Sequence, residues 1–252
     1  MARVLVTRAE PGASATAAKL AAGGHQPLLA PMLIIEAVPA DPALIGIQAV
    51  LFTSSNGARA FAAAVSGRDL PVFCIGDATA AAARSAGFAT VRSADGDVAA
   101  LAALVAGALA PDAGRLLHAA GADLAGDLAG DLRARGFDVE IRTYYRALTS
   151  PRLPAMVEQA LGDSPPAIDA VLFHSARAAA TFATLVKQRE GLARIDALCL
   201  SEAVADAVRP MPWRRVLVAG QPQEQALLLL LATTDSDQGR AKPGPDSSGH
   251  PA

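Results

Sequence analysis

The chain has 252 residues, which is enough for two domains of about 110 residues each. Its net charge of −2 gives no indication of a nucleic-acid-binding protein, and its longest apolar run, residues 98–111, is too short and too interrupted to span a membrane. The N-terminal residues lack the apolar core of a signal peptide, and both cysteines lie in buried-strand patterns, so we expect a cytoplasmic protein.

Short apolar runs alternate with alanine-rich helical stretches from the N-terminus onward. The predicted strands are residues 4–6, 50–52, 72–75, 116–117, 171–173, 198–200 and 216–218. These runs are continuous rather than alternating, as is typical of parallel strands buried on both faces. The predicted helices are residues 13–22, 57–65, 78–86, 98–109, 124–135, 176–187, 203–208 and 223–231. The alternation of strand and helix predicts open α/β sheets with right-handed crossovers.

Several segments occur twice. Ala49–Ser54 (AVLFTS) is repeated by Ala170–Ser175 (AVLFHS), 121 positions later. Val72–Gly76 is echoed by Ala197–Ser201, and the two cysteines coincide in that alignment. Duplicated units usually form two similar lobes, and the groove between such lobes is a natural ligand site.

Two extended stretches, residues 31–38 and 139–148, lie between the repeated segments. They look like strands that leave one lobe and enter the other. If the chain crosses twice, the first unit shares a lobe with the last, but two tandem lobes divided near residue 111 also fit the sequence. Residues 236–252 are rich in Gly, Pro and Ser without apolar periodicity, and we expect a disordered tail there.

Small polar residues follow several of the predicted strands. In open α/β sheets the loops at the carboxyl ends of the strands hold the ligand. The candidates are Thr7, Ser54–Gly57, Gly76–Thr79, Gly121, Ser175 and Ser201. Because the serines and Gly76 each open a predicted helix, simple N-capping is the competing interpretation, and the two roles can coexist.

The order and spacing of these segments resemble the uroporphyrinogen-III synthase family over about residues 3–231. The matching segments are Leu5–Arg8, Leu51–Gly57, Ile75–Ala80, Tyr145-Arg146 and Leu172–Ser175. The chain departs from the family pattern after Ser201, where family members often carry a threonine pair and this sequence reads Glu-Ala-Val. A hydroxyl contact from that loop is therefore in doubt, with Ser201 as its nearby replacement.

The resemblance implies a fold and a function. The fold has two similar lobes, each an open parallel sheet flanked by helices, joined by a two-stranded linker. One lobe would comprise residues 1–36 and 149–235, and the other residues 38–147. The function would be cyclisation of hydroxymethylbilane to uroporphyrinogen III with inversion of ring D, by a monomeric, cofactor-free lyase of porphyrin and heme biosynthesis. Transient contact with the upstream bilane-forming enzyme is also expected.

Hydroxymethylbilane carries eight carboxylates, so its site must satisfy many anions without a strongly basic protein. Helix N-termini can do this because their free N–H groups and dipoles favour negative charge. The candidate substrate-binding residues are Arg8, Ser54, Ser55, Asn56, Gly76, Thr79, Gly121, Ser175 and Ser201. Arg8 could pair with a carboxylate or lie in solvent, and Thr79 could bind substrate or stabilise its turn.

Tyr145 is the candidate catalytic residue, because the resemblance places it where the family's tyrosine is thought to help expel the substrate's hydroxyl. A phenol stays protonated at neutral pH and can donate to a leaving oxygen. Regular strand geometry predicts that Ile141, Thr143 and Tyr145 share one face and that Tyr144 points the other way. The alternative is that Tyr145 is a hinge residue packed on the core.

Other chemistries find little support in the sequence. His118 and His174 follow strands, but no carboxylate or cysteine stands at ligand spacing, so we expect no metal. The glycines at 121, 126 and 130 do not match a dinucleotide fingerprint. A non-enzymatic two-lobed binding or sensor protein for a small anionic ligand is the alternative function, and it differs from the enzyme in that it would not turn over hydroxymethylbilane.

Overall fold

The computed structural model describes residues 1–124, 126–187 and 190–232. The chain forms two compact units, one from residues 1–34 together with the described residues from 149 onward, the other from residues 35–148. We refer to them as unit 1 and unit 2. The predicted tail, residues 236–252, lies outside the described residues.

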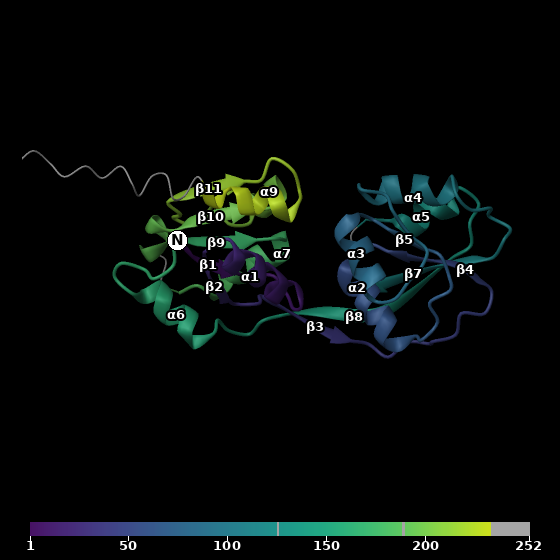
Figure 1. The fold of residues 1–252 in the computed structure, drawn as a ribbon, viewed down its shortest axis with the longest axis horizontal. Coiled ribbons are helices and arrows are strands. Elements are labelled where there is room, and N and C mark those ends of the chain that lie inside the picture. The colour runs from purple at the N-terminus through teal and green to yellow at the C-terminus, as the bar shows by residue number, and fades with distance from the viewer. Residues whose placement is uncertain (125, 188–189, 233–252) are drawn as a thin grey trace, which may run out of the picture. The chain divides into compact units, whose positions relative to one another are not determined.

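Unit 1 contains a five-stranded parallel sheet (Figure 1). In spatial order its strands are β11 (Arg215–Val218), β10 (Asp196–Cys199), β9 (Ala170–Phe173), β1 (Arg3–Val6) and β2 (Gln26–Leu29). Its helical segments are α1 (Gly12–Ala22), α6 (Ala155–Gly162), α7 (Ala176–Leu185), the 3-10 helix Glu190–Arg194, α8 (Glu202–Asp206) and α9 (Glu224–Leu229). Since β1 pairs with both β2 and β9, the N-terminal strand is an inner strand of a sheet whose other inner strands come from C-terminal residues.

Unit 2 contains a six-stranded sheet. In spatial order its strands are β3 (Leu33–Ala37), β8 (Val139–Thr149), β7 (Arg115–Gly121), β4 (Ile47–Phe52), β5 (Val72–Cys74) and β6 (Val91–Ser93). Its helices are α2 (Ser55–Ala64), α3 (Asp77–Ser85), α4 (Val98–Ala106) and α5 (Leu128–Arg133). The strands from β8 to β6 run parallel, and the chain passes between the units within β3 and within β8.

Each sheet is buried on both faces, as the continuous apolar strands predict. In unit 1, Leu5 packs with residues of α6, α7 and α8, whereas Val4 and Val6 pack with α1 and α9. In unit 2, one face packs on α2 and α3 and the other on α4 and α5. The predicted α/β class, with two mostly parallel sheets flanked by helices, is confirmed.

The two cysteines are buried free thiols within these cores. Burial raises the pKa of Cys74 and of Cys199 to about 12, so neither thiol ionises readily. They serve as small apolar side chains, as their position in the strand pattern indicates.

Candidate functional site

The carboxyl edge of the unit 2 sheet brings Ser54 and Tyr145 together. Ser54 follows β4 and is the N-cap of α2, where its Oγ accepts a hydrogen bond of 3.0 Å from the Gly57 N–H. The same Oγ lies 2.8 Å from the phenol oxygen of Tyr145 on β8. Ser54 therefore caps its helix, as the competing interpretation predicts, and also holds the tyrosine hydroxyl at the edge of the sheet.

The ring of Tyr145 lies directly against Gly121, its partner across the β7–β8 ladder. A Cβ atom on Gly121 would lie 2.6 Å from Cζ and 2.9 Å from the hydroxyl oxygen of Tyr145. A Cβ on Gly57 would come 2.8 Å from the Ala119 carbonyl oxygen and 3.8 Å from the Tyr145 ring. Gly121, predicted as a substrate-binding residue, is thus the surface on which the tyrosine rests.

The two adjacent tyrosines do not alternate as predicted. The β7–β8 register shifts so that Ala120 pairs with Thr143 and Gly121 with Tyr145, which leaves Tyr144 as the extra residue of a bulge. Tyr144 is 1% exposed and packs edge-on against Phe61 of α2, the helix that Tyr145 also contacts. The expectation that they face opposite ways is therefore wrong, because the bulge interrupts the two-residue period.

The other candidates of unit 2 lie around the N-termini of α2 and α3. Ser55 Oγ donates a hydrogen bond of 3.1 Å to the Ala78 carbonyl, and so ties the two helix starts together. Asn56 Oδ1 accepts a bond of 3.3 Å from Arg59. Gly76 is the N-cap of α3, and a Cβ atom there would meet nothing within 4 Å. Thr79 lies in the first turn of α3 and is 5% exposed.

His118 on β7 lies near this edge, although the sequence suggested no role for it beyond a metal ligand that was not expected. Its Nε2 lies 3.1 Å from the Thr53 hydroxyl, and its buried Nδ1 has no partner in the part of the chain that the structure describes. Burial lowers the pKa of His118 to about 4, so the ring is neutral at physiological pH. The Thr53 hydroxyl and the His118 ring are both uncharged, so this pair provides no positive charge for an anionic ligand.

The carboxyl edge of unit 1 gathers Arg8, Thr16, Lys19, His174 and Glu224, which we call the Glu224 cluster. Arg8 Nη1 donates to Glu224 Oε1 at 3.0 Å and to Thr16 Oγ1 at 3.3 Å. Thr16 and Lys19 also donate to the Glu224 carboxylate, and His174 Nε2 lies 3.8 Å from Oε1. Arg8 does pair with a carboxylate, but that carboxylate belongs to its own chain.

The surroundings fix the charges of this cluster. His174, Lys19, Thr16 and Arg8 hold the pKa of the Glu224 carboxyl far below its usual value, against the opposing effect of its partial burial. Burial lowers the pKa of His174, so that ring is neutral. The cluster therefore carries two positive charges and one negative charge at neutral pH.

The serines at the start of α7 and α8 differ in their hydrogen bonds. Ser175 Oγ accepts a bond of 3.2 Å from the Ala178 N–H and so caps α7. Ser201 is the N-cap residue of α8, but its side chain makes no capping hydrogen bond. Thr7, at the end of β1, is fully buried and donates to the Leu172 carbonyl at 2.7 Å, which makes it part of the core.

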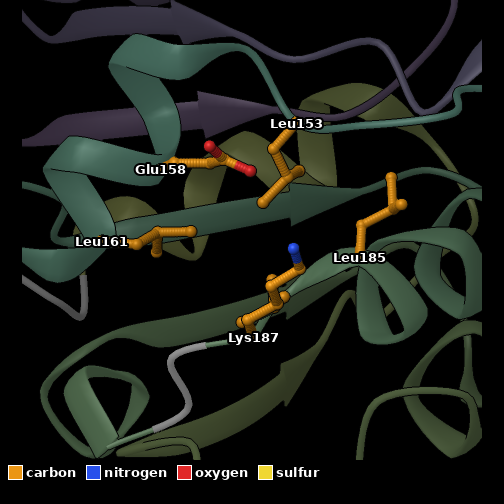
Figure 2. Close-up of a pocket in the computed structure, with 6 residues that line it drawn as sticks. Leu153, Glu158, Leu161, Leu185 and Lys187 are labelled. Carbon is orange, nitrogen blue, oxygen red and sulfur yellow. The ribbon is translucent and has the colours of Figure 1, made fainter.

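A cavity of about 180 Å³ in unit 1 lies away from these loops. Leu153 and Leu161 form its apolar wall, and Glu158 and Lys187 reach toward it from different segments (Figure 2). It lies beside the C-terminal end of α7, whereas the candidate residue Ser175 stands at the start of that helix. Within the described ranges there is neither a group of three His, Cys, Asp or Glu side chains able to hold a metal nor a helix with the length and apolar character to cross a membrane.

Comparison with known proteins identifies the family. The model of the family described as uroporphyrinogen-III synthase HemD matches residues 14–228. The uroporphyrinogen-III synthetase structure from Helicobacter pylori has a TM-score of 0.63 at 15% identity, covering 92% of this chain and 99% of that one. A mutant uroporphyrinogen-III synthase from Thermus thermophilus has a TM-score of 0.55 at 23% identity, covering 95% of this chain and 100% of that one. No curated protein sequence matches the chain.

Proposed function

This chain belongs to the uroporphyrinogen-III synthase family, and from that premise we propose how its carboxyl-edge residues serve the reaction. The protein is a cyclising lyase of tetrapyrrole biosynthesis, which closes hydroxymethylbilane to uroporphyrinogen III with inversion of ring D. The alternative of a non-enzymatic anion-binding protein is not favoured by the family match. What remains to be assigned is the role of each side chain.

The first chemical step is the loss of the substrate's terminal hydroxyl as water, which takes up one proton and leaves an electrophilic azafulvenium cation. Hydroxide is a poor leaving group, so a proton donor that reaches the departing oxygen lowers the barrier. We assign that role to the hydroxyl of Tyr145. The observation that carries the assignment is its 2.8 Å contact with Ser54 Oγ at the carboxyl edge of the unit 2 sheet.

Either oxygen can be the donor in the bond between Ser54 and Tyr145, and we assign the proton of that bond to Ser54. Ser54 Oγ then accepts the Gly57 N–H and donates its own proton to the phenol oxygen of Tyr145. Tyr145 can then direct its proton at the substrate, and the Ser54 hydroxyl stabilises the phenolate that forms. A chain of donors oriented in one direction strengthens each bond in it.

The remaining candidates bind the substrate's carboxylates rather than take part in proton transfer. The N-termini of α2, α3, α7 and α8, opened by Ser54, Gly76, Ser175 and Ser201, present backbone N–H groups at the carboxyl edges of the two sheets. Ser55, Asn56 and Thr79 stand in the first turns of α2 and α3. Gly121 supports the ring of Tyr145. In this scheme most of the rate enhancement comes from positioning the flexible substrate.

The setting of the enzyme follows from the same premise. We propose that it acts as a monomer in the cytoplasm, where two buried thiols stay reduced, and that it receives its substrate during transient contact with the bilane-forming enzyme. Analytical ultracentrifugation of the purified protein, alone and mixed with that enzyme, tests both the monomer and the contact.

A double-mutant cycle on Ser54 and Tyr145 tests the assignment. Tyr145→Phe keeps the ring and removes the proton, and it should lower the rate of uroporphyrinogen III formation by about a hundredfold or less. Ser54→Ala should cost less by itself, and little when added to Tyr145→Phe, because both act through one hydroxyl. Ser54→Thr, which keeps the hydroxyl and the cap, should restore most of the rate.

Tyr144→Phe is the matched control. Its hydroxyl donates to the Asp41 carbonyl, at 3.4 Å, and interacts with the Arg142 side chain, both within unit 2 and away from Ser54. Its removal should therefore leave the rate nearly unchanged. Equal small losses at Tyr144 and Tyr145, or fully additive losses at Ser54 and Tyr145, would contradict the proton-donor role and leave Tyr145 as a packed residue.

A further inference from the structure

The Glu224 cluster is built like a receptor for a carboxylate. Three side chains donate to the two oxygens of Glu224. Arg8 lies in the loop after β1, and Thr16 and Lys19 lie on α1. Charge-assisted bonds of this kind are the strong ones in proteins, and an arginine guanidinium matches carboxylate geometry. Two cations facing one anion leave a net positive charge, so the cluster also attracts anions from solution.

His174 shows that Glu224 does not complete the site. Its side chain is 9% exposed, and neither ring nitrogen has a hydrogen-bond partner among the described residues. The 3.8 Å between Nε2 and Glu224 Oε1 is too long for a hydrogen bond. A buried polar group without a partner is costly, so this ring points to an acceptor that Glu224 supplies only in part.

Arg8 is held in position for such an acceptor by the start of α1. A Cβ on Gly12 would lie 2.6 Å from Arg8 Nε and 3.0 Å from Nη2, so the guanidinium rests on the backbone of that glycine. Glu224, in contrast, is the first residue of a six-residue helix that follows the exposed residues 220–222. Arg8 thus lies in the loop after β1 and Lys19 on the eleven-residue helix α1, whereas the anion is carried by the shorter helix α9.

We propose that Arg8, Thr16, Lys19 and His174 form a carboxylate subsite, which the structure shows filled by the chain's own Glu224 and which a carboxylate of the substrate fills in its place. The inference rests on the proposed function, since hydroxymethylbilane supplies the carboxylates. Glu224 then lowers the substrate affinity by competition. A carboxylate of the substrate can bind only to molecules in which Glu224 has left the subsite, so the apparent Kd equals the intrinsic Kd divided by the fraction of such molecules.

The subsite itself is tested without turnover, with sodium propionate as the probe. In Glu224→Ala, propionate should raise the thermal unfolding midpoint in a saturable manner, while sodium chloride at equal ionic strength should not. Wild type should respond less, because Glu224 competes. The matched control is Glu224→Ala combined with Arg8→Met, which should abolish the response. If Glu224→Ala fails to fold, Glu224→Gln is titrated in its place, since a neutral amide holds the cations more weakly.

The substrate's use of the subsite is tested by steady-state kinetics of Glu224→Gln. The KM for hydroxymethylbilane should fall by about three- to tenfold as the internal competitor is weakened. A folded Glu224 variant that shows no propionate response would overturn the subsite, whatever the enzyme's activity. A propionate response combined with an unchanged or raised KM would overturn its use by the substrate. Loss of cyclisation with Tyr145 intact and propionate binding retained would count against the reaction scheme instead.

Discussion

Tyr145 is positioned by a glycine as well as by a hydrogen bond. The phenol ring occupies the volume that any side chain on Gly121 would fill, and its hydroxyl then reaches Ser54. Tyr145 directly follows the register shift at which Tyr144 is the extra residue of β8. The chemistry of one hydroxyl therefore depends on a neighbour with no side chain.

Gly121→Ala is expected to displace the ring and break the bond to Ser54. The new methyl group would lie 2.6 Å from Tyr145 Cζ, so the ring or the strand must move, at a cost of about 1–3 kcal/mol in the free energy of unfolding. The rate of uroporphyrinogen III formation should fall toward that of Tyr145→Phe. Gly220→Ala is the control, because a Cβ there meets nothing within 4 Å. Unchanged rate and stability in Gly121→Ala would contradict this account of the tyrosine's position.

His118 makes the stability of the protein depend on pH. In the folded protein burial lowers its pKa to about 4, whereas the unfolded chain takes up the proton near pH 6.5. The unfolded state therefore binds the proton first as the pH falls. The stability from neutral His118 is complete above pH 6.5 and is lost toward pH 4, in total about 3 kcal/mol. Urea unfolding of His118→Gln between pH 4 and 7 should give a shallower pH slope than wild type; an identical slope would contradict the prediction.

At the scale of helices, the same kind of residue serves different ends. Ser54 and Ser175 occupy equivalent positions in the two copies of the repeated segment, and each caps a helix through the N–H three residues later. Ser201 stands at a third helix start without a capping bond. Capping and substrate binding can therefore be separated by experiment at Ser175 and Ser201.

Alanine substitutions separate the two roles. Ser175→Ala should lower the free energy of unfolding by about 1 kcal/mol, because the Ala178 N–H loses its acceptor. Ser201→Ala should change it by no more than a few tenths, but should raise the KM for hydroxymethylbilane if its hydroxyl binds substrate. Denaturant unfolding and steady-state kinetics on both variants measure these effects. Equal destabilisation at the two sites would show that Ser201 also acts as a cap.

The strands show which structural features a sequence conveys. Most of the seven apolar runs form strands that are buried on both faces, and the burial selects continuous Val, Leu and Phe. The run 216–218, on the edge strand β11, is only half-buried. The strands β2 and β6 were not predicted. Both lie at sheet edges and are short, and β2 contains Pro27, which an edge strand tolerates. Helix α6 was not predicted either, because its eight residues follow Pro154 without a capping side chain that would mark a start.

The site was less predictable than the fold. Ser54 and Tyr145 could both be named as candidates, but their contact joins residues 91 positions apart and lies next to a bulge that has no residue signature. Glu224 was not predicted as a site residue. Its partner Arg8 lies 216 positions away, and glutamates are common in the first turn of helices. Pairings at such separations follow from the tertiary fold, which local patterns do not encode.

At the scale of the molecule, unit 2 has the features of an independently folding domain. The two apolar clusters that cover its sheet draw all their buried members from residues 47–144. We therefore expect the excised segment 38–147 to unfold cooperatively in urea, and a segment of residues 1–111 not to do so, because it lacks β7 and β8. Cooperative unfolding of residues 1–111 alone would contradict this division and favour tandem lobes.

As a member of its family, this protein directs the closure of a linear tetrapyrrole toward the inverted isomer. Without control of its conformation, hydroxymethylbilane closes spontaneously with ring D not inverted. The most direct measurement is the isomer ratio of the uroporphyrinogen formed from enzymatically generated hydroxymethylbilane, with and without the purified protein. We predict that the type III isomer predominates when the protein is present. Formation of the non-inverted isomer alone, at the rate seen without protein, would contradict the account.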